Sequence, residues 1–195
     1  MKKKWKLYPT NFKVLLGIII LFAIFALYQN QKQYAIREVD DERVPRLAEF
    51  FSGESFDGEE ITSDIFAKNK LTMIDVWATT CTACVADMPH LAAMEKKYAS
   101  QGFQVIGVCA DLRDKEQVKE ERVDTAREIQ KKTGVSYMQL IPSEEFQKEY
   151  LRVVVTATPH CFMVNQKGEI VETHVGAIPE DALAEKIEQC LKESE

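Results

Sequence analysis

Two cysteines separated by two residues, Cys81 and Cys84, are the residues best suited to chemistry in this chain. Such a pair can hold half of a metal site, form a structural disulfide, or open and close as a redox couple. A structural zinc site needs two further ligands at suitable spacing, and His90 follows Cys84 by six residues. Since the sequence contains no second Cys-x-x-Cys pair, a metal site is the least favoured of the three.

The residues around the pair favour redox chemistry. Residues 71–77 are apolar and β-prone except for Asp75, which predicts a buried strand, and apolar residues at helical spacing predict a helix over residues 82–100. Cys81 is then expected at a helix N-terminus, where unpaired amide groups and the macrodipole stabilise a thiolate. Cys84, one turn inside, is more sheltered. This asymmetry favours a centre for thiol-disulfide exchange.

Several segments of the chain resemble those of a known protein family. The segment from Asp75 to Pro89 reads Asp-Val-Trp-Ala-x-x-Cys-x-x-Cys-x-x-x-x-Pro and resembles the active-site segment of thioredoxins. The chain combines an apolar N-terminal segment with Asp87 and Pro89 after the cysteines, and in this it resembles the membrane-tethered TlpA/ResA-like branch of the family. Thr158-Pro159 resembles the cis-proline loop of the family, and residues 174–183 resemble its closing strand and last helix. The resemblance covers roughly residues 45–193.

The resemblance implies a role for each matching residue. Cys81 would be the attacking nucleophile and Cys84 the resolving thiol, and the two would form the redox-active disulfide. Asp75 would manage the proton of Cys84, because burial of an unpaired carboxylate raises its pKa towards the range useful for acid-base work. Neither a metal nor a cofactor beyond the disulfide is expected. Substrate contacts would come from residues beside the cysteines and from the cis-proline loop: Trp77, Thr80, Thr158 and Pro159.

The N-terminal residues predict a membrane anchor. Residues 14–28 form an unbroken run of fifteen apolar or amphipathic residues, preceded by five lysines and followed by an acidic stretch. At ~1.5 Å per residue the run spans roughly 22 Å, which also suits a cleaved signal peptide, although no small-x-small cleavage site follows. The positive-inside rule predicts residues 1–13 in the cytoplasm, 14–28 across the membrane, 29–44 as a tether and 45–195 as the outward-facing domain.

The rest of the chain predicts an α/β fold. The length of 195 residues and the 46% hydrophobic content suit one domain plus an extension, and the net charge of -6 argues against a nucleic-acid partner. Predicted elements follow the order β-α-β-α-β-α-β-β-α, which favours a central mixed sheet with helices on both faces, the thioredoxin fold. After the first strand and helix they cover residues 103–110, 114–133, 137–141, a helix capped by Ser143, 161–165, 169–174 and 179–192.

The remaining cysteines and His160 have several possible roles. Cys109 and Cys161 are expected on the two strands that flank the Asp75 strand, which is too far apart for a disulfide, so both are predicted to be core residues. Cys161 could also modulate the active site. Cys190 is predicted to pack on the last helix. His160 is expected to be an exposed loop residue, with contact to a substrate or a metal as the alternative.

These observations predict an extracytoplasmic thiol-disulfide oxidoreductase, a monomer that reduces disulfide-containing proteins. The family resemblance implies a membrane thiol-disulfide donor as the source of its electrons. Two alternatives share the fold. A Sco-like copper chaperone would bind copper through Cys81, Cys84 and His160, although its cysteines are typically one residue further apart. A peroxidase would need a Pro-x-x-x-Thr-x-x-Cys segment, whereas the residues before Cys81 are Asp-Val-Trp-Ala-Thr-Thr.

Overall fold

The structure, a computed structural model, describes Ile20 and residues 46–114 and 116–193. The chain divides into two units, Met1–Ala35 and Ile36–Glu195, and apart from Ile20 every described residue belongs to the second. The predicted cytoplasmic segment, membrane anchor and tether therefore lie outside the described residues, Ile20 excepted. Within the described ranges no helix is both long enough and apolar enough to cross a membrane.

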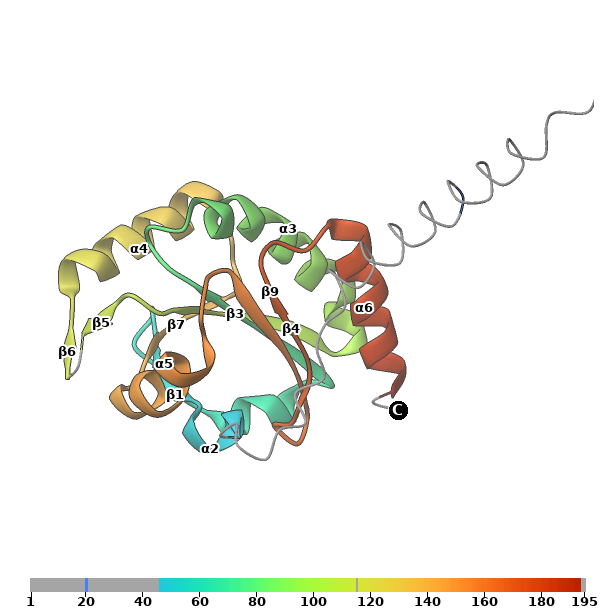
Figure 1. The fold of residues 1–195 in the computed structure, drawn as a ribbon, viewed down its shortest axis with the longest axis horizontal. Helices are drawn as coiled ribbons and strands as arrows, with labels where there is room; N and C mark the ends of the chain where they lie inside the picture. The colour runs from blue at the N-terminus through green and yellow to red at the C-terminus, as the bar shows by residue number, and fades with distance from the viewer. Residues whose placement is uncertain (1–19, 21–45, 115, 194–195) are drawn as a thin grey trace, which may run out of the picture. The chain divides into compact units, whose positions relative to one another are not determined.

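A seven-stranded mixed sheet forms the centre of the domain (Figure 1). The central strand β3 (Leu71–Trp77) pairs in parallel with β4 (Phe103–Cys109) and antiparallel with β8 (His160–Asn165). All seven residues of β3 are buried, as its continuous run of apolar residues predicts. The sheet order is β2-β1-β7-β4-β3-β8-β9, in which the remaining strands are β1 (Ser52–Ser55), β2 (Glu60–Thr62), β7 (Met138–Pro142) and β9 (Ile170–Val175).

Helices cover both faces of this sheet, which confirms the predicted thioredoxin-like architecture. Figure 1 shows α3 (Thr82–Tyr98), α4 (Glu120–Thr133) and α6 (Glu180–Glu193) over one face, with α2 (Leu47–Phe50) and α5 (Arg152–Val154) on the other. Alternate residues of β3 contribute to two separate cores: Met73 and Trp77 pack on the α3 side, Ile74 and Val76 on the α2 side. Short 3-10 helices follow β2 (Ser63–Lys68) and α3 (Ala99–Gln101), and a π-helix precedes α5 (Phe146–Leu151).

The predicted helix over residues 114–133 is wrong at its start. Helix α4 begins at Glu120, and the preceding residues form a small hairpin of β5 (Arg113–Asp114) and β6 (Gln117–Val118). The Lys119 amide donates to the carbonyl of Leu112 at 2.8 Å and closes the hairpin, and Arg113 Nε donates to the carbonyl of Pro142 at 3.0 Å and ties it to β7. Apolar residues are sparse in this charged segment, so the sequence did not indicate that the helix begins only at Glu120.

Candidate active site

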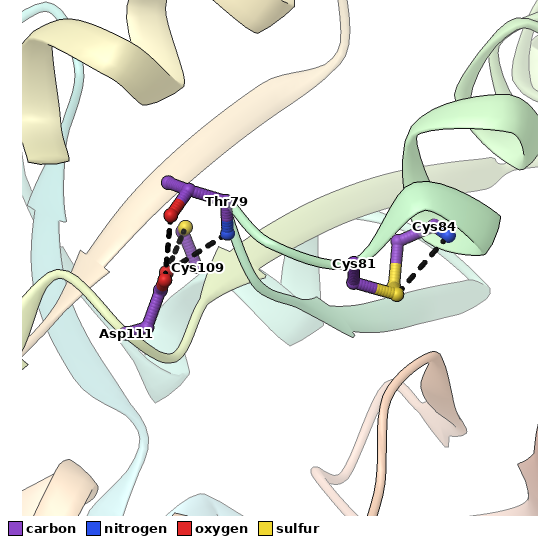
Figure 2. Close-up of a disulfide and its surroundings, with 5 residues drawn as sticks. All are labelled: Thr79, Cys81, Cys84, Cys109 and Asp111. Carbon is purple, nitrogen blue, oxygen red and sulfur yellow. Dashed lines mark hydrogen bonds between the residues drawn. A yellow bond between two sulfur atoms is a disulfide. The ribbon is translucent and has the colours of Figure 1, made fainter.

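The two cysteines form a disulfide at the amino end of α3 (Figure 2). Cys81 is the N-cap residue of the helix, and its sulfur accepts a hydrogen bond from the Cys84 amide at 3.2 Å. Cys81 is partly exposed, whereas Cys84 has 1% of its surface exposed. A reagent from solution can therefore reach Cys81 and not Cys84.

The end of β3 and the following loop position Cys81. The Trp77 carbonyl accepts a hydrogen bond from the Ala110 amide at 2.8 Å, which ties the loop to the chain after β4. The Cys81 amide donates to the Ala78 carbonyl at 2.9 Å and closes a turn directly before the helix. The strand thus delivers Cys81 to the helix terminus, where free amides stabilise a sulfur anion.

Asp75 lies in the interior beneath the helix. It alternates with Met73 and Trp77 on β3, so its side chain faces α3, and only 3% of its surface is exposed. Its Oδ2 finds no hydrogen-bond partner among the described residues. Burial, with a smaller contribution from the charge of Asp87, raises the pKa of Asp75 to about 7. A carboxyl group with this pKa can both release and accept a proton near neutral pH.

A small cavity adjoins Asp75. Its volume is about 20 Å³, room for about one water molecule. Asp87 and His90 of α3 line it together with Asp75, Pro159 and Cys161. Burial raises the pKa of Asp87, and the nearby His90 acts against this shift. The cavity therefore joins the buried carboxyl group of Asp75 to a second carboxyl group nearer the surface.

The peptide bond between Thr158 and Pro159 is cis, as the family resemblance implies. The carbonyl of Pro159 accepts a hydrogen bond from the Gly176 amide at 2.8 Å, which joins the cis-proline loop to the end of β9. Pro159 is buried and Thr158 is partly exposed, while Thr80, before the cysteines, is exposed. Thr80 and Thr158 are thus accessible to a partner molecule.

Trp77, expected to contact a substrate, has no exposed surface. Its indole Nε1 donates to Gln139 Oε1 at 2.9 Å, and the ring packs in the core that contains Cys84. In this oxidised conformation Trp77 supports the cysteine pair from the interior and does not offer a surface to a partner.

The expectation of an exposed His160 is wrong. His160 begins β8 and is 5% exposed, its ring stacks on Phe162 with a centroid distance of 4.4 Å, and its Nε2 lies 2.9 Å from Thr173 Oγ1. Since His160 and Phe162 share a face and Phe162 packs in the α2-side core, the ring lies on the opposite face of the sheet from Cys84. This placement argues against a copper site built from His160 and both cysteines.

The other cysteines lie where the sequence predicts them. Cys109 pairs in register with Trp77 and Cys161 with Asp75, so their strands flank β3 and both thiols are buried in the α3-side core. Cys190 is buried on α6. Cys161 also lines the cavity next to Asp75, which leaves a modulating role open to it.

Sequence reasoning missed a polar cluster around Asp111, which directly follows β4. Asp111 Oδ1 accepts from the Thr79 amide at 3.0 Å and Oδ2 accepts from the Thr79 hydroxyl at 2.6 Å (Figure 2). The Arg122 guanidinium donates to the same carboxylate, and so does the Cys109 thiol at 3.3 Å. The available signal was topological: β3 and β4 are parallel and in register, so the residues after Trp77 and after Cys109 must meet at one edge.

A disulfide at the start of the helix that follows a buried central strand, on a thioredoxin-like sheet with a neighbouring cis-proline, defines a thiol-disulfide oxidoreductase. Comparison with known proteins agrees with this class. The chain belongs to the Redoxin family, whose sequence model matches residues 41–190. This match and the relatives below confirm the resemblance to TlpA/ResA-like proteins.

Relatives span most of the chain at modest identity. The thiol-disulfide oxidoreductase ResA of Halalkalibacterium halodurans is 24% identical over 179 residues, which cover 89% of this chain and 90% of that protein. The thiol:disulfide interchange protein DsbE of Pasteurella multocida is 29% identical over 135 residues, 68% of this chain and 66% of that protein. A crystal structure of a putative DsbE from Chlorobium tepidum matches 82% of this chain and 99% of its own with a TM-score of 0.60 at 20% identity, which supports the fold.

Proposed function

We propose that this oxidoreductase is anchored in a membrane, faces the extracytoplasmic space and reduces protein disulfides, with Cys81 as the attacking and Cys84 as the resolving thiol. The observation that carries the division of labour is the unequal exposure of the two sulfurs. Cys81 is accessible and accepts a hydrogen bond from a helix amide, whereas Cys84 is 1% exposed and lies one turn inside. In an exchange centre the outer thiol meets the client and the inner thiol releases it.

The first step forms a mixed disulfide. The Cys81 thiolate attacks one sulfur of the client disulfide, a new bond joins Cys81 to the client, and the second client sulfur leaves as a thiolate. The amino end of α3 stabilises the attacking anion, and the Cys84 amide already donates a hydrogen bond to the Cys81 sulfur in the oxidised protein.

The second step releases the reduced client. Cys84 gives its proton to the Asp75 carboxylate and attacks the Cys81 sulfur, so the Cys81–Cys84 disulfide forms and the client leaves with two reduced sulfurs. The departing thiolate takes up a proton, which protonated Asp75 can supply through water in the adjoining cavity. Two electrons pass from the enzyme dithiol to the client disulfide, and a pKa near 7 lets Asp75 serve in both directions.

The surface around the disulfide suits a protein client. Residues 76–86, which carry the disulfide, contain no lysine, arginine, aspartate or glutamate, although 29% of the chain is charged. The same is true of residues 156–159 and 175–179, which the hydrogen bond from the Gly176 amide to the Pro159 carbonyl joins. Thr80 is exposed, and so is half of Val175, next to the glycine that binds the cis-proline carbonyl. An uncharged extended segment of a client could pair with the backbone of Thr158 without desolvating charges.

The direction of electron flow and the location rest on the sequence. A basic N-terminus, an apolar run and an acidic stretch favour a cytoplasmic N-terminus and an outward-facing domain. Because extracytoplasmic compartments oxidise thiols, a reductase tethered on that side of the membrane needs a thiol-disulfide donor within the membrane. The reduction potential of Cys81/Cys84 in glutathione buffers tests this direction: roughly -230 mV or below supports a reductase, and roughly -120 to -180 mV contradicts it.

Trapping tests the roles of the cysteines. In a Cys84→Ser variant of the full-length chain, Cys81 should accumulate in a mixed disulfide with a disulfide-containing peptide, which mass spectrometry of the non-reduced protein detects. A Cys190→Ser variant, at a buried position on α6 outside the disulfide and the Asp111 contacts, serves as a control and should turn over without accumulating the adduct. Failure of Cys84→Ser to trap an adduct on Cys81 would contradict the assignment of attacking and resolving thiols.

A further inference from the structure

The half-buried carboxylate of Asp111 accepts four hydrogen bonds. The Thr79 amide and hydroxyl, the Arg122 guanidinium and the Cys109 thiol all donate to it, and Arg122 also donates to the Thr79 hydroxyl at 3.1 Å. Burial acts to raise the pKa of Asp111, but these hydrogen bonds and the positive charge of Arg122 outweigh it and leave the pKa below its ordinary value. The carboxylate is therefore a fixed anion at physiological pH.

Thr79 lies two residues before Cys81, between two other anchor points of the same loop. The Trp77 carbonyl is bound by the Ala110 amide, and the Ala78 carbonyl accepts from the Cys81 amide. Thr79 adds a bidentate contact to Asp111 between these two bonds. Figure 2 shows the Asp111 cluster and the disulfide at the two ends of one short loop.

In the oxidised protein the disulfide itself fastens Cys81 to the helix. In the reduced protein that covalent bond is gone, and the loop before Cys81 must keep its sulfur at the amino end of α3. We propose that Asp111 is a positioning residue which, through Thr79, holds Cys81 in register with the helix terminus when the disulfide is open. The inference rests on the proposed role of Cys81 as the attacking thiol.

The positive charge of Arg122 offsets the negative charge of Asp111 near Cys81. A lone negative charge near Cys81 would oppose formation of the thiolate, whereas an ion pair between Asp111 and Arg122 presents little net charge. Asp111 can then serve as an acceptor with fixed geometry without disfavouring the nucleophile.

A matched pair of substitutions tests the proposal without changing any charge. Thr79→Val keeps the shape of the side chain and removes the hydroxyl, while Thr79→Ser keeps the hydroxyl. The rate of iodoacetamide alkylation of Cys81 is measured against pH in the reduced full-length chain in mild detergent. Thr79→Val should slow alkylation at pH 7 roughly fivefold and move the pH midpoint upward, because a displaced thiolate loses part of its stabilisation by the helix terminus. Thr79→Ser should stay within about twofold of the parent.

Equal rates in the two variants and the parent would overturn the positioning role. They would leave the proposed function intact, since trapping by Cys84→Ser tests that separately. If Thr79→Val does not fold, amide exchange of the parent protein decides. Protection of the Thr79 amide that survives reduction of the disulfide supports the proposal, and an exchange rate that rises more than about tenfold on reduction overturns it.

Discussion

Replacing Asp75 by asparagine should make the stability of the protein much less sensitive to pH. Burial raises the pKa of Asp75 from its ordinary 3.8 to about 7. Between these values the folded protein holds a proton at Asp75 that the unfolded chain has already released. A folded-state pKa above the unfolded value means that stability falls as the pH rises through this window. The gap between the two pKa values corresponds to roughly 4 kcal/mol lost by pH 8.

Asparagine has the shape of the carboxyl group and no charge, so the variant escapes this loss. Urea-induced unfolding of the oxidised full-length chain in mild detergent, followed by tryptophan fluorescence at pH 4 and pH 8, measures the free energies of unfolding. The informative quantity is the stability of Asp75→Asn minus that of the parent at each pH, since groups common to both proteins cancel. We expect this difference to rise by roughly 3 to 4 kcal/mol between pH 4 and pH 8.

Asp124→Asn, an exposed carboxyl group on α4, is the matched control, and its difference should change by less than about 0.5 kcal/mol. An Asp75→Asn difference that moves by less than about 1 kcal/mol would refute the reasoning, because it would mean that Asp75 titrates near its ordinary value. The acid-base role proposed for Asp75 would then lose its physical basis.

Three further outcomes are expected. Gly107→Ala should lower the free energy of unfolding by about 1–3 kcal/mol in chemical denaturation. The added Cβ would lie 2.3 Å from Gln139 Oε1, which accepts the hydrogen bond of the Trp77 indole. An unchanged free energy of unfolding would contradict this packing. Because burial lowers the pKa of His160 to about 4, its ring signals in NMR should not titrate between pH 5 and pH 8, and its contribution to stability should be complete above pH 6.5 and fall as the pH drops towards 4. A chromogenic thiol reagent should not react with the native oxidised protein and should react after denaturation, because burial covers and raises the pKa of the remaining thiols: Cys109, Cys161 and Cys190.

The linear order of residues was sufficient to predict the strand, turn and helix that carry the disulfide. Those elements are local: an apolar run ends, and a helical pattern begins at the first cysteine. The burial of Asp75 could be predicted from its place within that run, because every side chain of a strand that is covered on both faces is buried. The cis bond before Pro159 came from the family resemblance.

Features made by contacts between distant segments could not be read from local patterns. The Asp111 cluster joins residues 32 and 43 positions apart, and neither Thr79 nor Arg122 stands out in its own segment. His160 seemed exposed because it follows a proline, but pairing of β8 with β3 and β9 buries it. The hairpin before α4 likewise depends on the bond from Arg113 to Pro142 across the sheet.

Two carboxyl groups near the same end of β3 show how one fold sets opposite protonation states. Asp75 is buried with an oxygen that has no partner among the described residues, so its pKa rises to about 7 and the group can exchange protons. Asp111, past the end of the neighbouring strand, is surrounded by donors and an arginine, so its pKa falls and its charge is permanent. When two environments move the pKa values of like groups in opposite directions, one group is suited to acid-base chemistry and the other to a structural role. The carboxyl group that can exchange a proton lies on β3, on the face covered by α3, and the fixed charge lies beside the loop that carries Cys81.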